Sequence, residues 1–186
     1  MRIVEIFESI QGEGDYQGTP ALFIRLQGCN LRCKWCDTKY ARWSQNFKHM
    51  TVEEVVERIK EYKGEFVVFT GGEPLLQMEE VLKVCSSLFE YDPYSYLFML
   101  ETNGTLLPKP GTEELNDLLE GFDYICISPK DLKTAKKVSK QVKIWRERYG
   151  FYHVQIKVIP VQRIKSLMIT FSKKLDAEIL KEIFKE

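Results

Sequence analysis

The apolar residues of the chain fall into short segments with two alternating spacings. Short, almost fully apolar runs predict strands that are buried on both faces. They lie at Ala21–Leu26, Phe66–Phe69, Tyr96–Leu100, Tyr124–Ile127 and Val154–Ile159. Between these runs apolar residues recur at helical spacing, which predicts helices over 51–59, 78–89, 113–119 and 133–148. A further strand at 167–171 and a last helix from Asp176 to Phe184 complete the pattern.

This alternation predicts an α/β fold in which a parallel sheet packs against helices. The helix over 51–59 has the clearest start, because Thr51 and Glu54 have the spacing of a capping box. No internal repeat or low-complexity linker divides the chain, so residues 1–186 are expected to form a single domain.

Three of the predicted strands end directly in polar or glycine-rich motifs. The motifs are Thr70-Gly-Gly-Glu-Pro, Glu101-Thr-Asn-Gly-Thr and Ser128-Pro-Lys. Ligands of parallel α/β sheets bind at the C-terminal ends of the strands, so these motifs are expected to converge on one site. The paired glycines Gly71 and Gly72 would let a ligand approach the backbone closely.

The composition excludes several classes of function. Basic and acidic residues balance at 27 each, so bulk charge gives no reason to expect nucleic-acid or membrane binding. No apolar run reaches the roughly 18 residues of a transmembrane helix. The N-terminus lacks the apolar core and cleavage site of a signal peptide. We therefore expect a cytoplasmic protein with neither a membrane nor a nucleic-acid partner.

Three of the five cysteines crowd into one loop, Gly28-Cys29-Asn-Leu-Arg-Cys33-Lys-Trp-Cys36. In a reducing compartment, clustered thiols more often hold a metal or do redox chemistry than form disulfides. A structural zinc site takes four ligands, and neither a fourth cysteine nor a histidine lies near this loop. The spacing therefore favours a [4Fe–4S] cluster with one open iron over a zinc loop completed by a distant ligand. Cys85 and Cys126 are expected to be small buried core residues.

The CxxxCxxC spacing followed by Gly-Gly-Glu-Pro resembles the radical S-adenosylmethionine (SAM) superfamily. Further motifs in the same chain resemble one of its families, the 7-carboxy-7-deazaguanine synthases. These motifs are Phe7–Gly14, Phe23–Cys29, Cys36–Thr38, Glu101–Thr105 and Ser128–Lys130. The resemblance covers about residues 5–160 and implies a partial, open βα barrel with a parallel sheet. The barrel is expected to be shortened at its C-terminus, because one helix follows the last predicted strand.

The resemblance implies conversion of 6-carboxy-5,6,7,8-tetrahydropterin to 7-carboxy-7-deazaguanine with loss of ammonia, a step in queuosine and 7-deazapurine biosynthesis. It also implies a [4Fe–4S] cluster, SAM and Mg²⁺, and no catalytic side chains beyond those that bind the cofactors. The implied cluster ligands are Cys29, Cys33 and Cys36. Thr38 would bind Mg²⁺ through its hydroxyl.

The other implied residues surround SAM and the substrate. Those for SAM are Trp35, Cys36, Asp37, Gly72, Ser128, Pro129 and Lys130, and those for the pterin are Ile10, Gln11, Gly12, Arg25 and Thr70, with Glu13 nearby. The planar guanidinium of Arg25 suits the substrate carboxylate, and Lys130 would neutralise the carboxylate of SAM. As ordinary structural residues, Arg25 would be a surface ion-pair partner and Thr38 a turn residue.

The implied partners are an electron donor of the flavodoxin or ferredoxin type and a second copy of the chain, in a homodimer. The predicted helix over 133–148 carries many lysines and arginines, which form either a solvated face or a docking patch for an acidic reductase. Two other functions stay open. A glycyl-radical-enzyme activating protein has a nearly identical cysteine loop but acts on a protein backbone. A non-catalytic iron–sulfur or zinc protein would show a fourth protein ligand.

Overall fold

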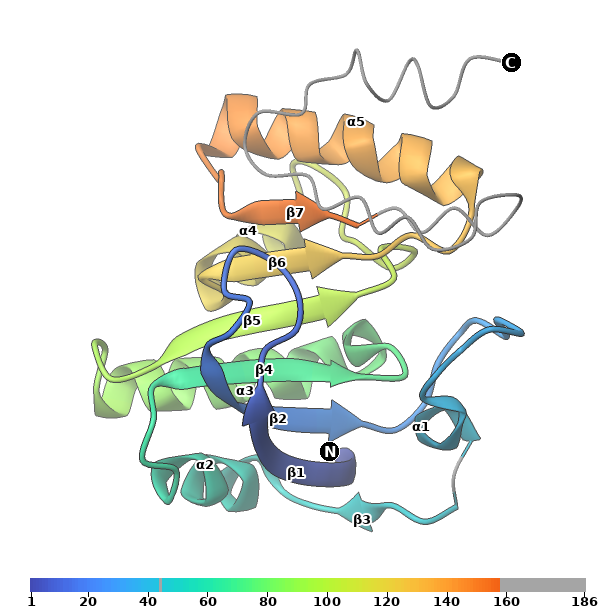
Figure 1. The fold of residues 1–186 in the computed structure, drawn as a ribbon. Helices are drawn as coiled ribbons and strands as arrows, with labels where there is room; N and C mark the ends of the chain where they lie inside the picture. The colour runs from blue at the N-terminus through green and yellow to red at the C-terminus, as the bar shows by residue number, and fades with distance from the viewer. Residues whose placement is uncertain (44, 158–186) are drawn as a thin grey trace.

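The computed structural model describes residues 1–43 and 45–157, which form one sheet of seven strands in the order β3-β1-β2-β4-β5-β6-β7 (Figure 1). The strands are β1 (Arg2–Ile10), β2 (Pro20–Leu26), β3 (Lys48–His49), β4 (Phe66–Gly71), β5 (Leu97–Thr102), β6 (Tyr124–Ile127) and β7 (Val154–Ile156). The helices are α1 (Lys39–Trp43), α2 (Val52–Lys60), α3 (Met78–Tyr91), α4 (Glu113–Gly121) and α5 (Leu132–Tyr149), with a 3₁₀ turn η1 at Pro74–Gln77. Among these described helices, none is long and apolar enough to cross a membrane.

Strands β2, β4, β5, β6 and β7 run parallel to one another, which confirms the predicted parallel sheet and α/β class. At least one helix lies in the connection between each successive pair, because parallel strands need a long crossover. In the described part of the chain, β3 and β7 are the two edges of the sheet. The sheet is therefore open, as a partial barrel is.

The N-terminal edge of the sheet departs from the predicted parallel pattern. β1 pairs with β2 and with β3 in antiparallel orientation, and the apolar pattern predicted neither β1 nor β3. The reason is burial: Ile3 is the one buried residue of β1, so this strand lacks the continuous apolar run of a strand covered on both faces. Helix α1 has five residues, too few to show a helical period.

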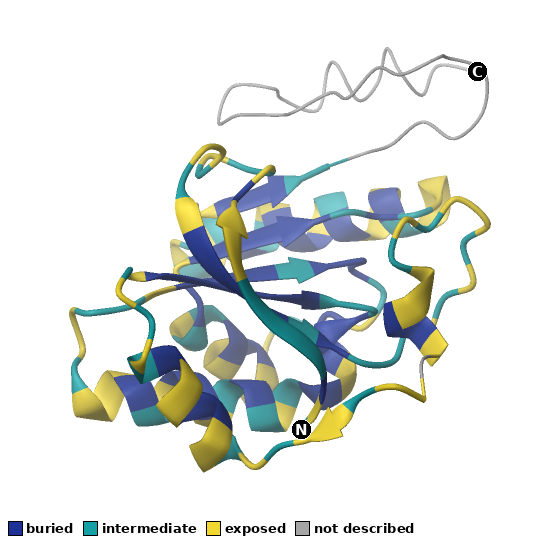
Figure 2. Cartoon of the chain, turned by 60° about the horizontal axis from the view of Figure 1, so that its bottom comes forward, coloured by how far each residue is buried: buried dark blue, intermediate teal, exposed yellow. Residues whose placement is uncertain are grey.

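Helices α2 to α5 pack against one face of the sheet and form the main core with it. Ile24, Phe69, Leu100 and Ile125 point from the strands into this core, and Trp145 of α5 packs there as well. Figure 2 shows buried residues along the sheet and exposed residues on the outer sides of the helices. Alternate residues of each parallel strand are thus committed to the helices, which leaves the others for the opposite face.

That opposite face is covered near its N-terminal end by the loop between β1 and β2, residues 11–19 (Figure 1). Tyr16 stacks on Phe66 with a centroid distance of 4.8 Å and meets Tyr124 edge-on at 5.3 Å. The Asp15 backbone N–H donates a hydrogen bond to the Tyr124 hydroxyl at 3.2 Å. These contacts close the start of the parallel strands and leave their C-terminal ends open for a ligand.

The helices predicted over 51–59, 78–89, 113–119 and 133–148 are confirmed as α2 to α5, with ends shifted by a few residues. The capping box is present, because Thr51 Oγ1 accepts from the Glu54 N–H at 3.2 Å and Glu54 Oε2 accepts from the Thr51 N–H at 2.7 Å. β7 covers the start of the strand predicted at Val154–Ile159. The strand predicted at 167–171, the helix predicted at 176–184 and the shortened barrel end lie outside the described residues.

Candidate functional site

The face of the sheet opposite the helices changes from apolar to polar along its strands. Ahead of the C-terminal ends of the strands, neighbouring side chains form an apolar row, which consists of Phe23, Val68, Met99 and Tyr124. Two residues further on, the same face presents a polar row, because every second side chain of a strand points to the same side. This row consists of Arg25, Thr70, Glu101 and Cys126. The polar residues therefore gather at the C-terminal ends of the strands, as predicted.

Glu101 is the centre of this polar row. Its Oε2 accepts a hydrogen bond from Thr70 Oγ1 at 2.7 Å, and its Oε1 accepts one from Gln11 Nε2 at 3.1 Å. Burial raises the pKa of Glu101 and the nearby Glu13 carboxylate raises it further, whereas the bonds from Thr70 and Gln11 lower it. The result is a carboxylate of fixed orientation at the floor of a cavity.

Arg25 lies at the β2 end of the polar row, and its side chain is fixed by an ion pair and two aromatic rings. Its Nε donates to Glu5 Oε1 at 2.7 Å, and the Tyr40 hydroxyl donates to the same oxygen at 2.8 Å. The guanidinium lies over the rings of Phe7 and Tyr40, 5.3 Å and 5.8 Å from their centroids. The Arg25 side chain is 15% exposed and lines the cavity. The ion pair with Glu5 uses one edge of the guanidinium, so the fork can still face an anion.

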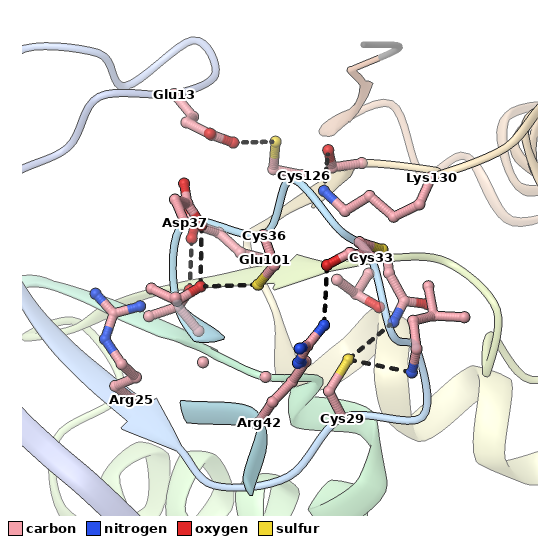
Figure 3. A pocket seen from close by; sticks show the side chains of 18 of the residues that line it. Glu13, Arg25, Cys29, Cys33, Cys36, Asp37, Arg42, Glu101, Cys126 and Lys130 are labelled. Atoms are coloured by element: carbon pink, nitrogen blue, oxygen red, sulfur yellow. Dashed lines mark hydrogen bonds between the residues drawn. The ribbon is translucent and has the colours of Figure 1, made fainter. Parts of the chain in front are cut away.

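The loop with the three cysteines lies opposite the polar row (Figure 3). Cys29 Sγ accepts from the Leu31 N–H at 3.4 Å and lies 4.0 Å from Asn103 Nδ2, and Cys36 Sγ lies 3.8 Å from the Thr38 hydroxyl. Burial raises the pKa of the Cys29 thiol most strongly, and the Leu31 N–H lowers it. Hydrogen bonds to sulfur tune and steady an iron–sulfur cluster.

The three thiols line the cavity as separate potential metal ligands. Among the described residues, no three His, Cys, Asp or Glu side chains gather around a single point as the ligands of one ion would. A [4Fe–4S] cluster does not need such a point, because each thiolate binds a different iron. The donor set therefore fits a cluster.

The paired glycines at the end of β4 support the base of this loop. The Gly72 N–H donates to the Leu26 carbonyl at 3.1 Å, and the Glu73 N–H donates to the Gly28 carbonyl at 2.8 Å. A Cβ on Gly72 would overlap the Gly28 carbonyl oxygen and lie 3.0 Å from Cys29 Cβ. Gly72 lines the cavity, where SAM contact is predicted, and it also has a packing reason to be glycine.

Glu73 joins the glycine motif to the Glu101-Thr-Asn-Gly-Thr motif. Its side chain is fully buried; Oε1 accepts from Thr102 Oγ1 at 2.7 Å and from the Leu75 N–H at 3.1 Å, and Oε2 accepts from the Asn103 N–H at 2.8 Å. Burial raises the pKa of Glu73, and these three donors lower it. Asn103 Nδ2 in turn donates to Asn30 Oδ1 at 3.0 Å. Glu73 therefore fixes the segment Thr102–Asn103, which in turn is hydrogen-bonded to the cysteine loop.

The third wall of the cavity comes from the ends of β6 and β7. Lys130 Nζ donates to Ser128 Oγ at 2.9 Å. Glu13 forms an ion pair with Lys157 and accepts from Cys126 Sγ at 3.6 Å. Burial, and then the Glu13 carboxylate, raise the pKa of the Cys126 thiol well above its usual value. Cys126 is buried as predicted, as is Cys85, but Cys126 also lines the cavity.

These walls enclose a cavity of about 340 Å³. Most of the residues implied for the cofactors and substrate line it, namely Arg25, Cys29, Cys33, Trp35, Cys36, Asp37, Thr38, Thr70, Gly72, Ser128 and Lys130. Ile10, Gln11, Gly12 and Pro129 do not. Gln11 is buried and reaches the cavity through Glu101, whereas Ile10 is 57% exposed. Pro129 is buried between two lining residues.

Several residues that line the cavity are not among those predicted from the sequence. Glu101 and Asn103 line the cavity and belong to a motif at the end of a predicted strand. Their position in that motif is the sequence feature from which a role in the site could have been predicted. Arg42 and Lys157 also line the cavity. They carry no comparable signal, because isolated basic residues are common on protein surfaces.

Comparison with known proteins identifies the family of this site. A sequence model of the Radical SAM superfamily matches residues 23–180. A 7-carboxy-7-deazaguanine synthase of Aquifex aeolicus is 34% identical over 197 residues, which cover 97% of this chain and 86% of the relative. The chain belongs to the 7-carboxy-7-deazaguanine synthase family. Membership of the radical SAM superfamily implies a [4Fe–4S] cluster and SAM.

Two further relatives in the synthase family are longer than this chain. The synthases of Hyperthermus butylicus and Haemophilus influenzae are 42% and 38% identical over 145 and 134 residues, which cover 78% and 72% of this chain. The matched regions are 58% and 55% of those relatives, so the chain spans little more than half their length. The crystal structure of QueE from Escherichia coli has the same fold, with a TM-score of 0.59 at 24% identity, covering 88% of this chain and 84% of that one.

Proposed function

We propose that the chain converts 6-carboxy-5,6,7,8-tetrahydropterin to 7-carboxy-7-deazaguanine with loss of ammonia, in queuosine and 7-deazapurine biosynthesis. The observation that carries this proposal is a single cavity between the three-cysteine loop and a row that contains Arg25 and Glu101. A pterin with a carboxylate on one side and ring N–H groups on the other is complementary to the Arg25 guanidinium and the Glu101 carboxylate. The names of the family members support the same activity.

The cysteine loop and the ends of β4 and β6 are the proposed cofactor site. Cys29, Cys33 and Cys36 would hold the cluster. When bound, the cluster and SAM supply one-electron cleavage of the sulfonium and abstraction of a hydrogen atom from the substrate. The residues proposed to position SAM are Trp35, Cys36, Asp37, Gly72, Ser128, Pro129 and Lys130. The ammonium of Lys130, oriented by Ser128, offers a positive charge to the SAM carboxylate.

The polar row is the proposed substrate site. Arg25 would bind the pterin carboxylate, while Glu5 and two aromatic rings hold its guanidinium in place. Thr70 and Gln11 both donate to Glu101, so the Glu101 carboxylate faces the ring N–H groups in one orientation. Ile10 and Gly12 flank Gln11 in the chain and would contribute backbone groups.

Thr38 is the proposed ligand of Mg²⁺. Its hydroxyl lines the cavity and lies 3.0 Å from Asp37 Oδ1. Hydroxyl and carboxylate oxygens are ligands that Mg²⁺ accepts, together with water and the oxygens of a substrate. Bound beside the cavity, Mg²⁺ would orient the substrate carboxylate and balance its charge.

The direct test is an anaerobic assay of the reconstituted protein. The protein is given SAM, a reductant, Mg²⁺ and 6-carboxy-5,6,7,8-tetrahydropterin, and 7-carboxy-7-deazaguanine and ammonia are measured. We expect both products, and we expect none from a Cys33→Ala variant. Formation of 5′-deoxyadenosine without the deazaguanine would reject the substrate while retaining radical SAM chemistry.

The comparisons give no support to a glycyl-radical-enzyme activating protein, and the geometry also favours a small substrate. The polar row lines a cavity that is also lined by Glu13, from the loop at 11–19, and by Lys157, which forms an ion pair with Glu13. To reach the polar row, the backbone of a protein substrate would have to enter this cavity. Glycyl-radical formation on an added activase target, without deazaguanine product, would overturn the preference.

We propose the exposed lysines of α5 as the docking patch for an acidic flavodoxin or ferredoxin. Lys136, Lys137 and Lys140 are exposed on the outer side of the helix. Charge reversal at these three positions should slow flavodoxin-driven turnover and spare dithionite-driven turnover. Equal effects on both would remove the patch from consideration.

We further propose a cytoplasmic homodimer, as the family resemblance implies. All five cysteines of the chain are free thiols, which suits a reducing compartment. Light scattering coupled to gel filtration measures the mass of the particle, and a monomer at micromolar concentration would contradict the dimer.

A further inference from the structure

Arg42 is a buried cation that has no acidic partner in the described part of the chain. It lies on α1, directly after the cysteine loop, and is 8% exposed. None of the ion pairs formed among the described residues includes it, and its Nε has no hydrogen-bond partner there. Guanidinium groups stay charged in proteins, and burying an unpaired charge is strongly unfavourable. The burial of Arg42 therefore calls for an anion beside it.

The contacts of Arg42 indicate where that anion lies. Its Nη1 donates to the Cys33 carbonyl at 2.9 Å, and its guanidinium lies 4.2 Å from the centroid of the Trp43 ring. Helix α1 is tied to the same loop, because the Ala41 carbonyl accepts from the Gly28 N–H at 2.8 Å. Arg42 lines the cavity together with the three cysteines, and Figure 3 shows its guanidinium among them.

We propose that Arg42 is the counter-charge of the [4Fe–4S] cluster and that it raises the cluster's reduction potential. This inference rests on the cluster site of the proposed function, but not on the identity of the substrate. Three thiolates outweigh the positive charge of the cluster core in both oxidation states, and reduction adds one more negative charge. A buried cation beside the thiolates therefore stabilises the reduced cluster more than the oxidised one. Arg42 acts through the cluster, so it is a positioning residue.

The competing explanation is structural. Arg42 could serve only to hold the Cys33 carbonyl and to pack on Trp43. Charge and shape can be separated by two substitutions: Arg42→Lys keeps the charge and loses the planar group, whereas Arg42→Gln loses the charge and keeps an amide donor. Arg32→Gln is the matched control, because Arg32 is an exposed arginine of the same loop that lies 5.1 Å from the same Trp43 ring.

The first measurement is the midpoint potential of the reconstituted cluster, from a redox titration followed by electron paramagnetic resonance without substrate. In Arg42→Gln we expect the reduced state to lose at least tenfold in relative stability, which is a fall of about 59 mV for a one-electron couple. Arg42→Lys should retain most of the wild-type potential, and Arg32→Gln should match the wild type. An unchanged potential in Arg42→Gln, or equal falls in the Gln and Lys variants, would overturn the proposal.

The second measurement is thermal melting of the cluster-free protein, together with iron content after reconstitution. Removing an unpaired buried charge should leave cluster-free Arg42→Gln at least as stable as the wild type, while its iron is lost more readily to a chelator. If this variant fails to retain a cluster, wild-type melting with lost iron supports the proposal. Melting well below the wild type in the cluster-free state shows a structural role and overturns it. Neither readout uses the pterin, so a failed synthase assay leaves this test intact.

Discussion

Gly72 packs against the backbone of the cysteine loop so closely that a single added methyl group should destabilise the fold. A Cβ built on Gly72 lies 2.6 Å from the Gly28 carbonyl carbon and 3.0 Å from Cys29 Cβ, and it overlaps the Gly28 carbonyl oxygen. Non-bonded carbon atoms normally sit about 3.5–4.0 Å apart. In Gly72→Ala, the cysteine loop must therefore retreat by about 1 Å, which breaks the 2.8 Å bond between the Glu73 N–H and the Gly28 carbonyl.

The cost of this retreat has two parts. Overpacking against backbone costs about 1–3 kcal/mol, and a lost hydrogen bond between buried groups costs about 1 kcal/mol more. We therefore expect Gly72→Ala to lower the free energy of unfolding by about 2–4 kcal/mol. For a chain of this size the urea midpoint should fall by about 1–2 M.

The assay is urea unfolding of the cluster-free protein, followed by circular dichroism and tryptophan fluorescence. Gly12→Ala is the stability control, because a Cβ there meets nothing within 4 Å. Alanine at such a position is neutral or stabilises by up to about 1 kcal/mol. If Gly72→Ala and Gly12→Ala unfold at the same urea concentration, the packing explanation of Gly72 is refuted.

Three further outcomes are expected. The pKa of Glu101 is raised on folding, so its stabilising contribution is present below the unfolded value and is lost as pH rises through the folded value. As pH rises from 4 to 7, the melting temperature of Glu101→Gln should therefore increase relative to that of the wild type. Melting temperatures of the two proteins that change in parallel with pH would contradict this. Arg25→Lys loses the bidentate fork and should lower kcat/KM for the carboxypterin roughly ten- to hundredfold; an unchanged kcat/KM would exclude carboxylate binding by Arg25. Thr38→Val should raise the Mg²⁺ concentration for half-maximal turnover while Thr38→Ser restores it, and identical Mg²⁺ titrations would exclude Thr38 as a ligand.

Sequence reasoning succeeded wherever one local signal decides the structure. The apolar runs at β4 and β6 are buried on both faces, so they show no alternation that could be confused with an edge strand. The capping box at Thr51 is equally local. The convergence of motifs at the strand ends followed from a general property of parallel sheets. Local signals and one topological rule thus located the cavity.

The parts that escaped prediction depend on contacts between distant segments. β1 is held by pairing with β2 and β3, and its own residues show little burial. Glu73 looked like part of a turn motif, but its fully buried carboxylate accepts hydrogen bonds from Thr102, the last residue of β5, and from Asn103, which follows it. Arg42 belongs to no sequence motif, and its burial follows from the tertiary structure alone. Such partners become visible only when the tertiary structure is known.

The loop at 11–19 also determines when the cavity can exist during folding. Its hydrogen bonds and ion pair connect Gln11 to Glu101, Asp15 to Tyr124 and Glu13 to Lys157, over sequence separations of 90, 109 and 144 residues. Contacts between residues so far apart in sequence form slowly, because the entropy of closing a long loop is lost before the contacts stabilise the chain. The helices on the other face rely on nearer neighbours, such as α2 and α3. A chain emerging from the ribosome can therefore begin its main core early, but its substrate pocket waits until β7 has been synthesised.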